Sequence, residues 1–569
     1  MRFLNNLIII VMKKYHIILI LFILAFKADS QWISNYMGNP IGDVSLSNAH
    51  GISVTVDNNG YCYITGYVDE NNGEGNNVLT IKYNSSSGDT LWVRTFNGTD
   101  NNDDRGKDIK VDAFGNVYVT GSVININTGI DAVLLKYSPD GVLLWNTSYS
   151  GNQNINAEDV GNAIALDSWG NIYMTGYCTN PDMLNDIILV KYSSSGSQLW
   201  VKKEDGPSDL LSQGVNIAVD SYGYNIYVLG FITGDQTQGD IALVRYTFWG
   251  YQYPVKYING PVNSEDRAFG IAVDANNNVY ITGYITTDSV SGNTDCITTK
   301  FNNYGNVVWS VSYNGEGSDR AFGIAVDEDG SAYITGYTTN SYGTKDYLTV
   351  AYNNSGQQKW FAVYNGPGSG DDKASAIGIV TNSNNTKSVI VTGSSWGLNN
   401  NDDYATLNYD IADGTLQSES RYSMTEETED IANDLVIDND NNAFITGYSQ
   451  LLGDLQTTGS AVSTLKIVPA SGGKSVTNNG LPSKYTLSQN YPNPFNPSTT
   501  IKFTLPENSN VKLCIYDVTG RIVSTLINEY LNSGTYEIKF NAQGISSGVY
   551  FYELRANSYR DIKKMTLIK

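Results

Sequence analysis

One repeat of this sequence, residues 267–315, reads RAFGIAVDANNNVYITGYITTDSVSGNTDCITTKFNNYGNVVWSVSYNG. Short segments rich in β-branched and aromatic residues, which favour strands, lie within it at 268–274, 279–284, 295–301 and 307–313. Stretches of Asn and other polar residues, which favour turns, separate these segments. The repeat therefore predicts four antiparallel β-strands joined by turns.

The Thr-Gly dipeptide of this repeat recurs along the chain, once as Leu-Gly. Its glycines are Gly66, Gly121, Gly176, Gly230, Gly283, Gly336, Gly393 and Gly447. Intervals of 53 to 57 residues are typical of β-propellers, in which each period forms one four-stranded blade. Because a single sheet cannot bury both of its faces, neighbouring blades stack on one another. We predict an all-β, eight-bladed propeller over residues 31–469.

The two ends of the repeat array complement each other. Fourth strands carry the pattern Trp-x-x-x-Tyr-x-Gly, as at 145–151 and 309–315, but the eighth unit stops after its third strand at 463–467. Trp32 and Tyr36 carry the same pattern and belong to no other unit. We predict that this segment supplies the missing strand and closes the ring. The alternative, an open solenoid, leaves sheet edges unpaired, which favours aggregation.

The units resemble the bacterial β-propeller repeat family known as SBBP. The resemblance rests on Ala-x-x-Ile-Ala-Val-Asp, Gly-Asn-x-Tyr-x-Thr-Gly and Lys-Tyr-x-x-x-Gly-x-x-x-Trp, which stand nearly whole from Ala163 to Trp200. It extends over residues 43–469, although the Ser-x-x-Phe-Pro segment common in that family is absent. The resemblance implies a fold and no particular activity, since propellers serve many functions.

A different module, residues 485–569, follows a linker rich in Gly, Ser and Asn at 470–484. It opens with several prolines, which cannot sit in a central strand. Short alternating segments follow at 500–505, 511–516, 521–526, 536–540, 549–554 and 563–568. These segments predict a small C-terminal Ig-like β-sandwich.

This module resembles the C-terminal (type A) sorting domain of proteins exported by the Bacteroidetes-type type IX secretion system. The matching residues form its opening, two later turns and its end: Tyr491, Pro492, Asn493, Pro494, Phe495, Asn496, Gly520, Gly548, Tyr550, Lys563 and Lys564. The resemblance implies that the type IX machinery is a partner and that the chain passes through the periplasm to the outer cell surface or the medium. The alternative is an ordinary accessory sandwich.

Residues 1–30 are expected to be a signal peptide. Two lysines precede the apolar run 17–26, which is too short for a bilayer span of about 20 residues. Small side chains place the expected cleavage between Ser30 and Gln31. We hypothesise that translation starts at Met12, and we expect no transmembrane segment in the mature form.

Charge restricts the partners. Residues 31–469 carry 50 acidic and 20 basic side chains, and such a surface repels phosphate groups, so nucleic acid is not an expected partner. The four cysteines, at 62, 178, 296 and 514, lack the spacing of a metal site. We expect a monomer that recognises an extracellular protein or glycan.

The sequence predicts no catalytic residue. Apart from His16 in the expected signal peptide, His50 is the one histidine, and an isolated loop histidine is usually solvated. Residues 393–397 match Gly-x-Ser-x-Gly, but a nucleophile elbow needs a strand that leads into a helix, whereas this segment is a Thr-Gly turn. We therefore discount it.

One series of acidic residues is a candidate site. An aspartate recurs before the first strand of six units: Asp104, Asp159, Asp266, Asp319, Asp372 and Asp430. Because first strands line the channel of a propeller, we hypothesise a broken ring at one channel mouth that binds Ca²⁺ or a cationic ligand. The alternative is that each aspartate caps a backbone turn in its own blade. No other cofactor and no other metal site are predicted.

These observations favour an exported, non-enzymatic binding or scaffold protein at the cell surface or outside the cell. A hydrolase or lyase that acts on glycans with carboxylates alone is one alternative, because such chemistry needs no histidine. A structural adhesin is another, suggested by the high Tyr and Asn content.

Overall fold

The computed structural model describes residues 30–568 apart from 39–46, 70–72, 74, 152–156, 207–210, 235–238, 369, 383–385, 400, 426–427, 453–457, 469–484, 491, 506–508, 520, 532–533, 543–544 and 558. The secondary structure of the described residues is all β, as the sequence predicts. None of the described segments is a helix with the length and hydropathy needed to span a bilayer. The expected signal peptide up to residue 29 and the linker 470–484 lie outside the described residues.

Most of the chain forms four-stranded antiparallel sheets of consecutive strands. One sheet contains β6 (Arg105–Val111), β7 (Val117–Asn125), β8 (Gly129–Tyr137) and β9 (Leu143–Tyr149). The next contains β10 (Asp159–Leu166), β11 (Ile172–Thr179), β12 (Asn185–Tyr192) and β13 (Gln198–Glu204). A third contains β14 (Ser212–Val219), β15 (Asn225–Ile232), β16 (Asp240–Thr247) and β17 (Lys256–Ile258). A fourth sheet contains β18 (Arg267–Val273), β19 (Val279–Thr286), β20 (Thr294–Phe301) and β21 (Val307–Tyr313). A fifth contains β22 (Asp319–Val326), β23 (Ala332–Thr339), β24 (Lys345–Tyr352) and β25 (Gln358–Tyr364). A sixth contains β26 (Asp372–Thr381), β27 (Lys387–Trp396), β28 (Asp402–Asp410) and β29 (Leu416–Tyr422).

A larger sheet joins the two ends of the repeat array. It contains β2 (Asn48–Val56), β3 (Cys62–Asp69), β4 (Asn76–Tyr83) and β5 (Thr90–Phe96) together with β30 (Asp430–Ile437), β31 (Ala443–Leu452), β32 (Thr458–Ile467) and β1 (Ser30–Tyr36). The two groups of four touch through the parallel bridge Asn48–Ser460. Strand β1 pairs antiparallel with β32, so that Trp32 lies opposite Lys466 and Tyr36 opposite Val462.

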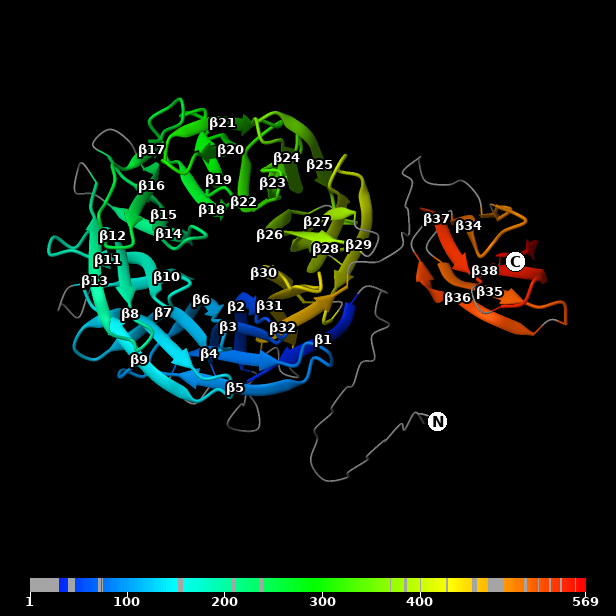
Figure 1. The fold of residues 1–569 in the computed structure, drawn as a ribbon, viewed down its shortest axis with the longest axis horizontal. Coiled ribbons are helices and arrows are strands. Elements are labelled where there is room, and N and C mark those ends of the chain that lie inside the picture. Colours follow the sequence, from blue (N-terminus) through cyan, green and yellow to red (C-terminus); the bar gives the residue numbers. More distant parts are fainter. Residues whose placement is uncertain are drawn as a thin grey trace, which may run out of the picture.

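Figure 1 shows these sheets arranged in a ring, with the first strand of each group innermost. Apolar side chains of adjacent sheets pack between them. One such cluster combines Tyr63 and Val78 of β3 and β4 with Val119 and Leu135 of β7 and β8. The core is therefore divided into layers between neighbouring sheets, as stacking of two-faced sheets requires.

The Thr-Gly dipeptide has a structural cause. Each first strand skips one residue in its pairing with the second strand, a β-bulge, at Ile52, Lys107, Asn162, Val215, Phe269, Phe322, Ser375 and Asn433. At the bulge a first-strand carbonyl lies so close to the glycine that no side chain fits there. A Cβ at Gly121 would lie 1.9 Å from the backbone oxygen of Arg105. The threonine beside it, Thr120, donates a hydrogen bond to the carbonyl of Val133 on the third strand.

Neighbouring sheets are also fastened at their outer strands. Trp92 and Lys82 of one sheet both donate hydrogen bonds to the carbonyl of Pro139 in the next sheet, at 3.1 and 3.0 Å. The indole covers the glycine of that turn, where a Cβ at Gly141 would lie 2.8 Å from the ring. Trp32 and Lys466 repeat the arrangement on the carbonyl of Ser85, at 2.8 and 3.1 Å. Strand β1 thus contributes to the outer edge of the β30–β32 group as a fourth strand does elsewhere.

The turns between first and second strands share one design. In the first of them, an oxygen of Asp57 accepts the backbone N–H groups of Asn59 and Tyr61, each at 2.9 Å, and its other oxygen accepts the hydroxyl of Tyr63. Asp167 accepts the corresponding donors in the third unit. Such side-chain bonds to local backbone fix a tight turn, and the residue two positions after the aspartate, Asn59 or Trp169, is exposed.

The C-terminal module consists of two sheets around one apolar cluster. One sheet contains β33 (Thr486–Leu487), β34 (Ser498–Leu505) and β37 (Gly534–Asn541), and the other contains β36 (Ile522–Leu531), β35 (Ser509–Tyr516), β38 (Gly548–Ala556) and β39 (Tyr559–Leu567). Buried residues of both sheets, such as Ile501, Phe503, Leu513 and Tyr552, form the shared cluster. Two sheets that face one core make a sandwich.

Candidate functional site

The structure places the six predicted aspartates at the start of first strands, in six different sheets. Their side chains are fully buried and bind the loop that enters each sheet. Asp104 accepts the N–H of Gly98 at 2.5 Å with one oxygen and that of Ile124 at 2.7 Å with the other. Asp159 and Asp266 make the same pair of bonds, with Gly151 and Thr179 and with Gly260 and Thr286. These contacts tie the incoming loop to the second strand of the sheet.

Burial dominates the electrostatics of this series. It raises the pKa of Asp104, Asp159 and Asp266 to about 6, although the backbone N–H donors lower it. The pKa of Asp430 is raised to about 7 by the same cause. Among the described residues, no three His, Cys, Asp or Glu side chains gather in a way that could hold a metal ion. The observed contacts are those of the backbone-capping alternative, and Ca²⁺ binding stays a prediction for titration.

Aromatic and cationic side chains alternate at the same end of the sheets. The residue after the Thr-Gly or Leu-Gly glycine is aromatic in six units, and a first-strand arginine of the next sheet lies over three of these rings. Arg105 lies 4.9 Å from the ring centre of Tyr67, Arg267 3.4 Å from Phe231 and Arg320 4.1 Å from Tyr284. Cation–π contacts of this kind hold neighbouring sheets together and orient the guanidinium groups.

Two of these guanidinium groups are neutralised by an adjacent acid. Arg267 pairs with Glu265 at 2.8 Å and Arg105 with Asp103 at 3.5 Å. Arg320 makes no ion pair with a described carboxylate, and its Nε is buried without a hydrogen-bond partner in the described structure. Its charge is available to a carboxylate or hydroxyl group that approaches this end of the ring.

His50 belongs to the same series but is not a candidate base. Its ring stacks on Tyr67 at 4.7 Å and contacts Tyr448 of the β30–β32 group at 4.0 Å. Burial, and secondarily the charge of Arg105, lowers the pKa of its imidazole to about 4. A neutral imidazole packed between two tyrosines supports the junction between the ends of the array and is poorly placed to exchange protons.

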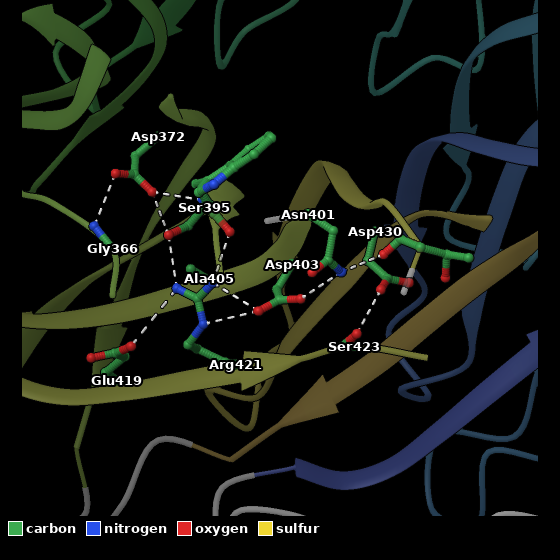
Figure 2. Close-up of polar contacts among 12 residues, drawn as sticks. Gly366, Asp372, Ser395, Asn401, Asp403, Ala405, Glu419, Arg421, Ser423 and Asp430 are labelled. Atoms are coloured by element: carbon green, nitrogen blue, oxygen red, sulfur yellow. Dashed lines mark hydrogen bonds and ion pairs between the residues drawn. The ribbon is translucent and has the colours of Figure 1, made fainter. Parts of the chain in front are cut away.

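The Gly-x-Ser-x-Gly segment forms part of a buried polar network in the β26–β29 sheet (Figure 2). Ser395 lies in strand β27, where its hydroxyl donates to Asp372 at 2.5 Å and accepts from Arg421 Nη1 at 2.7 Å. Arg421 also pairs with Asp403 at 2.9 Å. The hydroxyl proton and one lone pair of Ser395 are thus engaged by buried charged groups. The segment up to Trp396 lies within strand β27 and not in the turn that the sequence analysis expected.

This network also connects two sheets. The hydroxyl of Tyr364, at the end of β25, accepts an N–H of Arg421 at 3.1 Å and donates to Glu419 at 2.7 Å. Arg421 and Asp403 are both largely buried. Removing one partner of such a pair leaves an uncompensated charge, which makes the network a stability determinant.

Sequence reasoning missed the cation–π series and the Arg421 network. The first had a readable signal, because an aromatic residue follows the Thr-Gly glycine at Tyr67, Tyr177, Tyr284, Tyr337 and Tyr448 and a cation often follows the aspartate of the candidate series. The second had none, because Arg421 and Asp403 stand on different strands with no fixed spacing in other units.

The ends of the C-terminal module meet at its opening motif. Phe495 is buried, donates its N–H to the carbonyl of Thr566 and accepts the N–H of Ile568, both at 3.0 Å. Asn493 accepts the N–H of Thr566 at 2.9 Å. Tyr550 is buried and donates to the carbonyl of Ser546, whereas Lys564 is exposed. Tyr491 and Gly520 of the predicted motif lie outside the described residues.

Comparison with known families finds a match in each part of the chain. Residues 489–569 match the family described as the secretion system C-terminal sorting domain, and residues 312–343 match the beta-propeller repeat family SBBP. The sorting-domain match covers the contacts between Phe495 and β39 described above.

Other proteins resemble the chain more distantly. An uncharacterised WD repeat-containing protein of Acanthamoeba polyphaga mimivirus is 25% identical over 350 residues, 50% of this chain, and the chain spans only 24% of that protein's length. The structure of PorZ from Porphyromonas gingivalis, an essential surface component of its type IX secretion system, matches with 12% identity and a TM-score of 0.26, over 94% of this chain and 85% of PorZ. A puromycin hydrolase matches with 10% identity and a TM-score of 0.38, over 71% of this chain and 59% of the hydrolase.

Proposed function

Because the chain carries SBBP β-propeller repeats and a type IX secretion C-terminal sorting domain, we propose that it is a binding protein without catalytic activity that works at the cell surface or outside the cell. The sorting domain indicates secretion to one of these two locations and recognition by the type IX machinery. The match over residues 489–569 is the observation that carries the export part of the proposal.

The chemistry of the described groups supports a binding role over catalysis. The candidate aspartates accept backbone N–H donors inside the sheets. His50 is held neutral between two aromatic rings, and Ser395 is bonded to an aspartate and an arginine. A general acid or base must reach the substrate's proton directly or through one water, and these groups are engaged elsewhere.

We also propose that the ring counts as eight blades. The β30–β32 group with β1 and the β2–β5 group each contain four strands, and the bridge Asn48–Ser460 alone pairs the first strand of one with the third of the other. The proposed boundaries remain residues 31–469 for the propeller, 470–484 for the linker and 485–569 for an Ig-like sorting sandwich.

Deletion of residues 485–569 tests the proposal of type IX export. We expect the truncated chain to accumulate in the periplasm, measured by immunoblotting of periplasmic, surface and medium fractions. Phe495→Ala should reduce export because it removes the side chain packed at β39, whereas Val518→Ala, an exposed site in the same module, should not. Truncated protein in the medium at the level of the intact chain would refute the sorting role. Turnover of a polysaccharide by the purified protein would refute the non-enzymatic assignment.

A further inference from the structure

Several turns on one face of the ring carry aromatic residues where other units have polar ones. At the second position after the turn aspartate, the second, third and fourth units carry Phe114, Trp169 and Tyr222, whereas other units carry Asn59, Asn276 or Asp329. The turn between β16 and β17 contains Phe248 and Trp249, where the preceding unit has Ser194 and Ser195. This departure from the repeat serves no requirement of the turn itself, because the polar versions form the same turns.

The aromatic side chains form one contiguous cluster. We call Trp169, Tyr222, Tyr224, Phe248 and Trp249 the aromatic patch. The ring of Trp169 lies 5.0 Å from Phe248 in an edge contact and 5.5 Å from Tyr224, while Phe248 contacts Trp249 at 5.7 Å and Tyr224 contacts Tyr222 at 6.4 Å. The patch therefore bridges the β10–β13 and β14–β17 sheets.

The patch is exposed and rigidly mounted. Trp169, Tyr222 and Trp249 are 52%, 65% and 76% exposed. The N–H of Trp169 binds Asp167 at 3.0 Å, and the N–H of Tyr224 binds Asp220 at 2.8 Å, so the turns are fixed before any ligand arrives. Exposed aromatic clusters of this kind mark interaction sites, and fixing them in advance lowers the entropy lost on binding.

The charged side chains that reach the patch are engaged in contacts. Lys191 lies 3.1 Å over the ring of Phe248 and donates to its carbonyl, Arg245 donates to Asn225, and Glu204 accepts from Gln252. The turns 167–171, 220–225 and 247–253 contain no charged side chain other than Asp167 and Asp220, which are buried in turn hydrogen bonds. Serine, asparagine and glutamine supply the remaining polar groups. Lys191 is buried, and Arg245 and Glu204 are bonded to residues of these turns. The exposed rings of the patch therefore offer apolar faces rather than a free charge, which favours a neutral ligand that has both apolar faces and hydroxyl groups.

We propose that the aromatic patch binds a neutral polysaccharide. The C–H faces of pyranose rings pack on indole and phenol faces, and their hydroxyls bond to the neighbouring Ser, Asn and Gln groups. The inference rests on the proposed function as an extracellular binding protein and names the ligand class. Aromatic residues are also enriched in protein interfaces, so binding of a protein partner is the competing outcome of the test.

The test compares a patch variant with a matched control in the purified full chain. The patch variant is Trp169→Ala/Trp249→Ala. The control is Tyr342→Ala, because Tyr342 is 92% exposed, lies in the loop between β23 and β24 at the opposite edge of its sheet, and has its N–H bound to Asn340 as Trp169 binds Asp167. Retention is measured by sedimentation with cellulose, chitin and β-1,3-glucan, and by affinity electrophoresis in gels that contain xylan or mannan.

We expect retention of the wild-type protein by at least one of these polymers. The patch variant should lose about tenfold in affinity or more, which corresponds to about 1.4 kcal/mol, with an unchanged melting temperature, while Tyr342→Ala binds like the wild type. Failure of the wild type to bind any polymer overturns the inference, and so does retention that survives in the patch variant. Binding that depends on the patch only with alginate or only with a purified protein also overturns it. Normal secretion of the patch variant would show that such a failure leaves the proposed export intact.

Discussion

Replacement of Trp32 by alanine tests how firmly strand β1 closes the ring. The indole is 8% exposed, its N–H donates to the carbonyl of Ser85 at 2.8 Å, and its ring contacts Tyr83 and Phe444 at 6.0 and 5.9 Å. Truncating a buried tryptophan costs about 3–5 kcal/mol, and the stranded carbonyl of Ser85 keeps its second donor, Lys466. We therefore expect Trp32→Ala to lower the free energy of unfolding by about 4 kcal/mol.

The assay is guanidinium denaturation followed by far-UV circular dichroism, because fluorescence would change with the loss of a tryptophan. Trp32→Phe separates the two contributions, since it keeps an aromatic ring and should cost about 1 kcal/mol through the lost hydrogen bond. Trp145→Ala is the matched control, because Trp145 makes the corresponding bond to Ser194 at 3.3 Å within a continuous stretch of chain but is more exposed. A loss below about 1 kcal/mol for Trp32→Ala, the size of a surface effect, would refute the inference that β1 seals the ring.

Three further perturbations follow from the buried groups. Burial raises the folded-state pKa of Asp104, Asp159 and Asp266 to about 6 and that of Asp430 to about 7. Each of these groups should therefore stabilise the fold most below pH 4 and lose that contribution as pH rises to 7, by up to about 1.4 kcal/mol per pH unit. The lowered pKa of His50 acts in the opposite direction, as one group against four; chemical denaturation across this range checks the net slope, and a rise in stability with pH contradicts it. Arg421→Met should cost about 3–5 kcal/mol by leaving Asp403 buried and unpaired, and the double variant with Asp403→Asn should recover part of the loss; equal melting temperatures for wild type and single variant would contradict the network. Calcium should leave the melting temperature unchanged if the aspartates only cap backbone, whereas a saturable rise would support the Ca²⁺ hypothesis.

The repeat could be predicted from sequence because its signals are local. Alternating apolar residues and Asn-rich turns at 268–301 specify strands wherever they recur, and the described sheets confirm an all-β chain of four-stranded units. The fourth strand of the fourth unit is shorter than the repeat pattern predicts. This strand, β17, has three residues, and Pro254 precedes it without an N–H to donate. Tyr253 lies outside that strand, under Arg245 at 4.1 Å.

The candidate site was harder to predict because its decisive features depend on pairing between units. The spacing of Asp104 and its counterparts is visible in the sequence, but the partners of each carboxylate are backbone groups that no sequence pattern records. The aromatic patch combines Trp169 with Phe248, nearly 80 positions apart. The sequence shows that each of these aromatic residues differs from the repeat pattern. It does not show that they touch, because that contact depends on how two sheets stack.

The pairing of β1 with β32 also has a consequence for the order of events during synthesis. The hydroxyl of Ser463 donates to Asn35, a partner 428 residues earlier in the chain. Because a polypeptide is synthesised from its N-terminus, Asn35 is made long before Ser463. The pairing of β1 with β32 can therefore form only when nearly all of the repeat array is available. The sorting domain, residues 489–569, follows β32 in the sequence and is made last. The residues that close the ring are therefore all present before the sorting domain is complete.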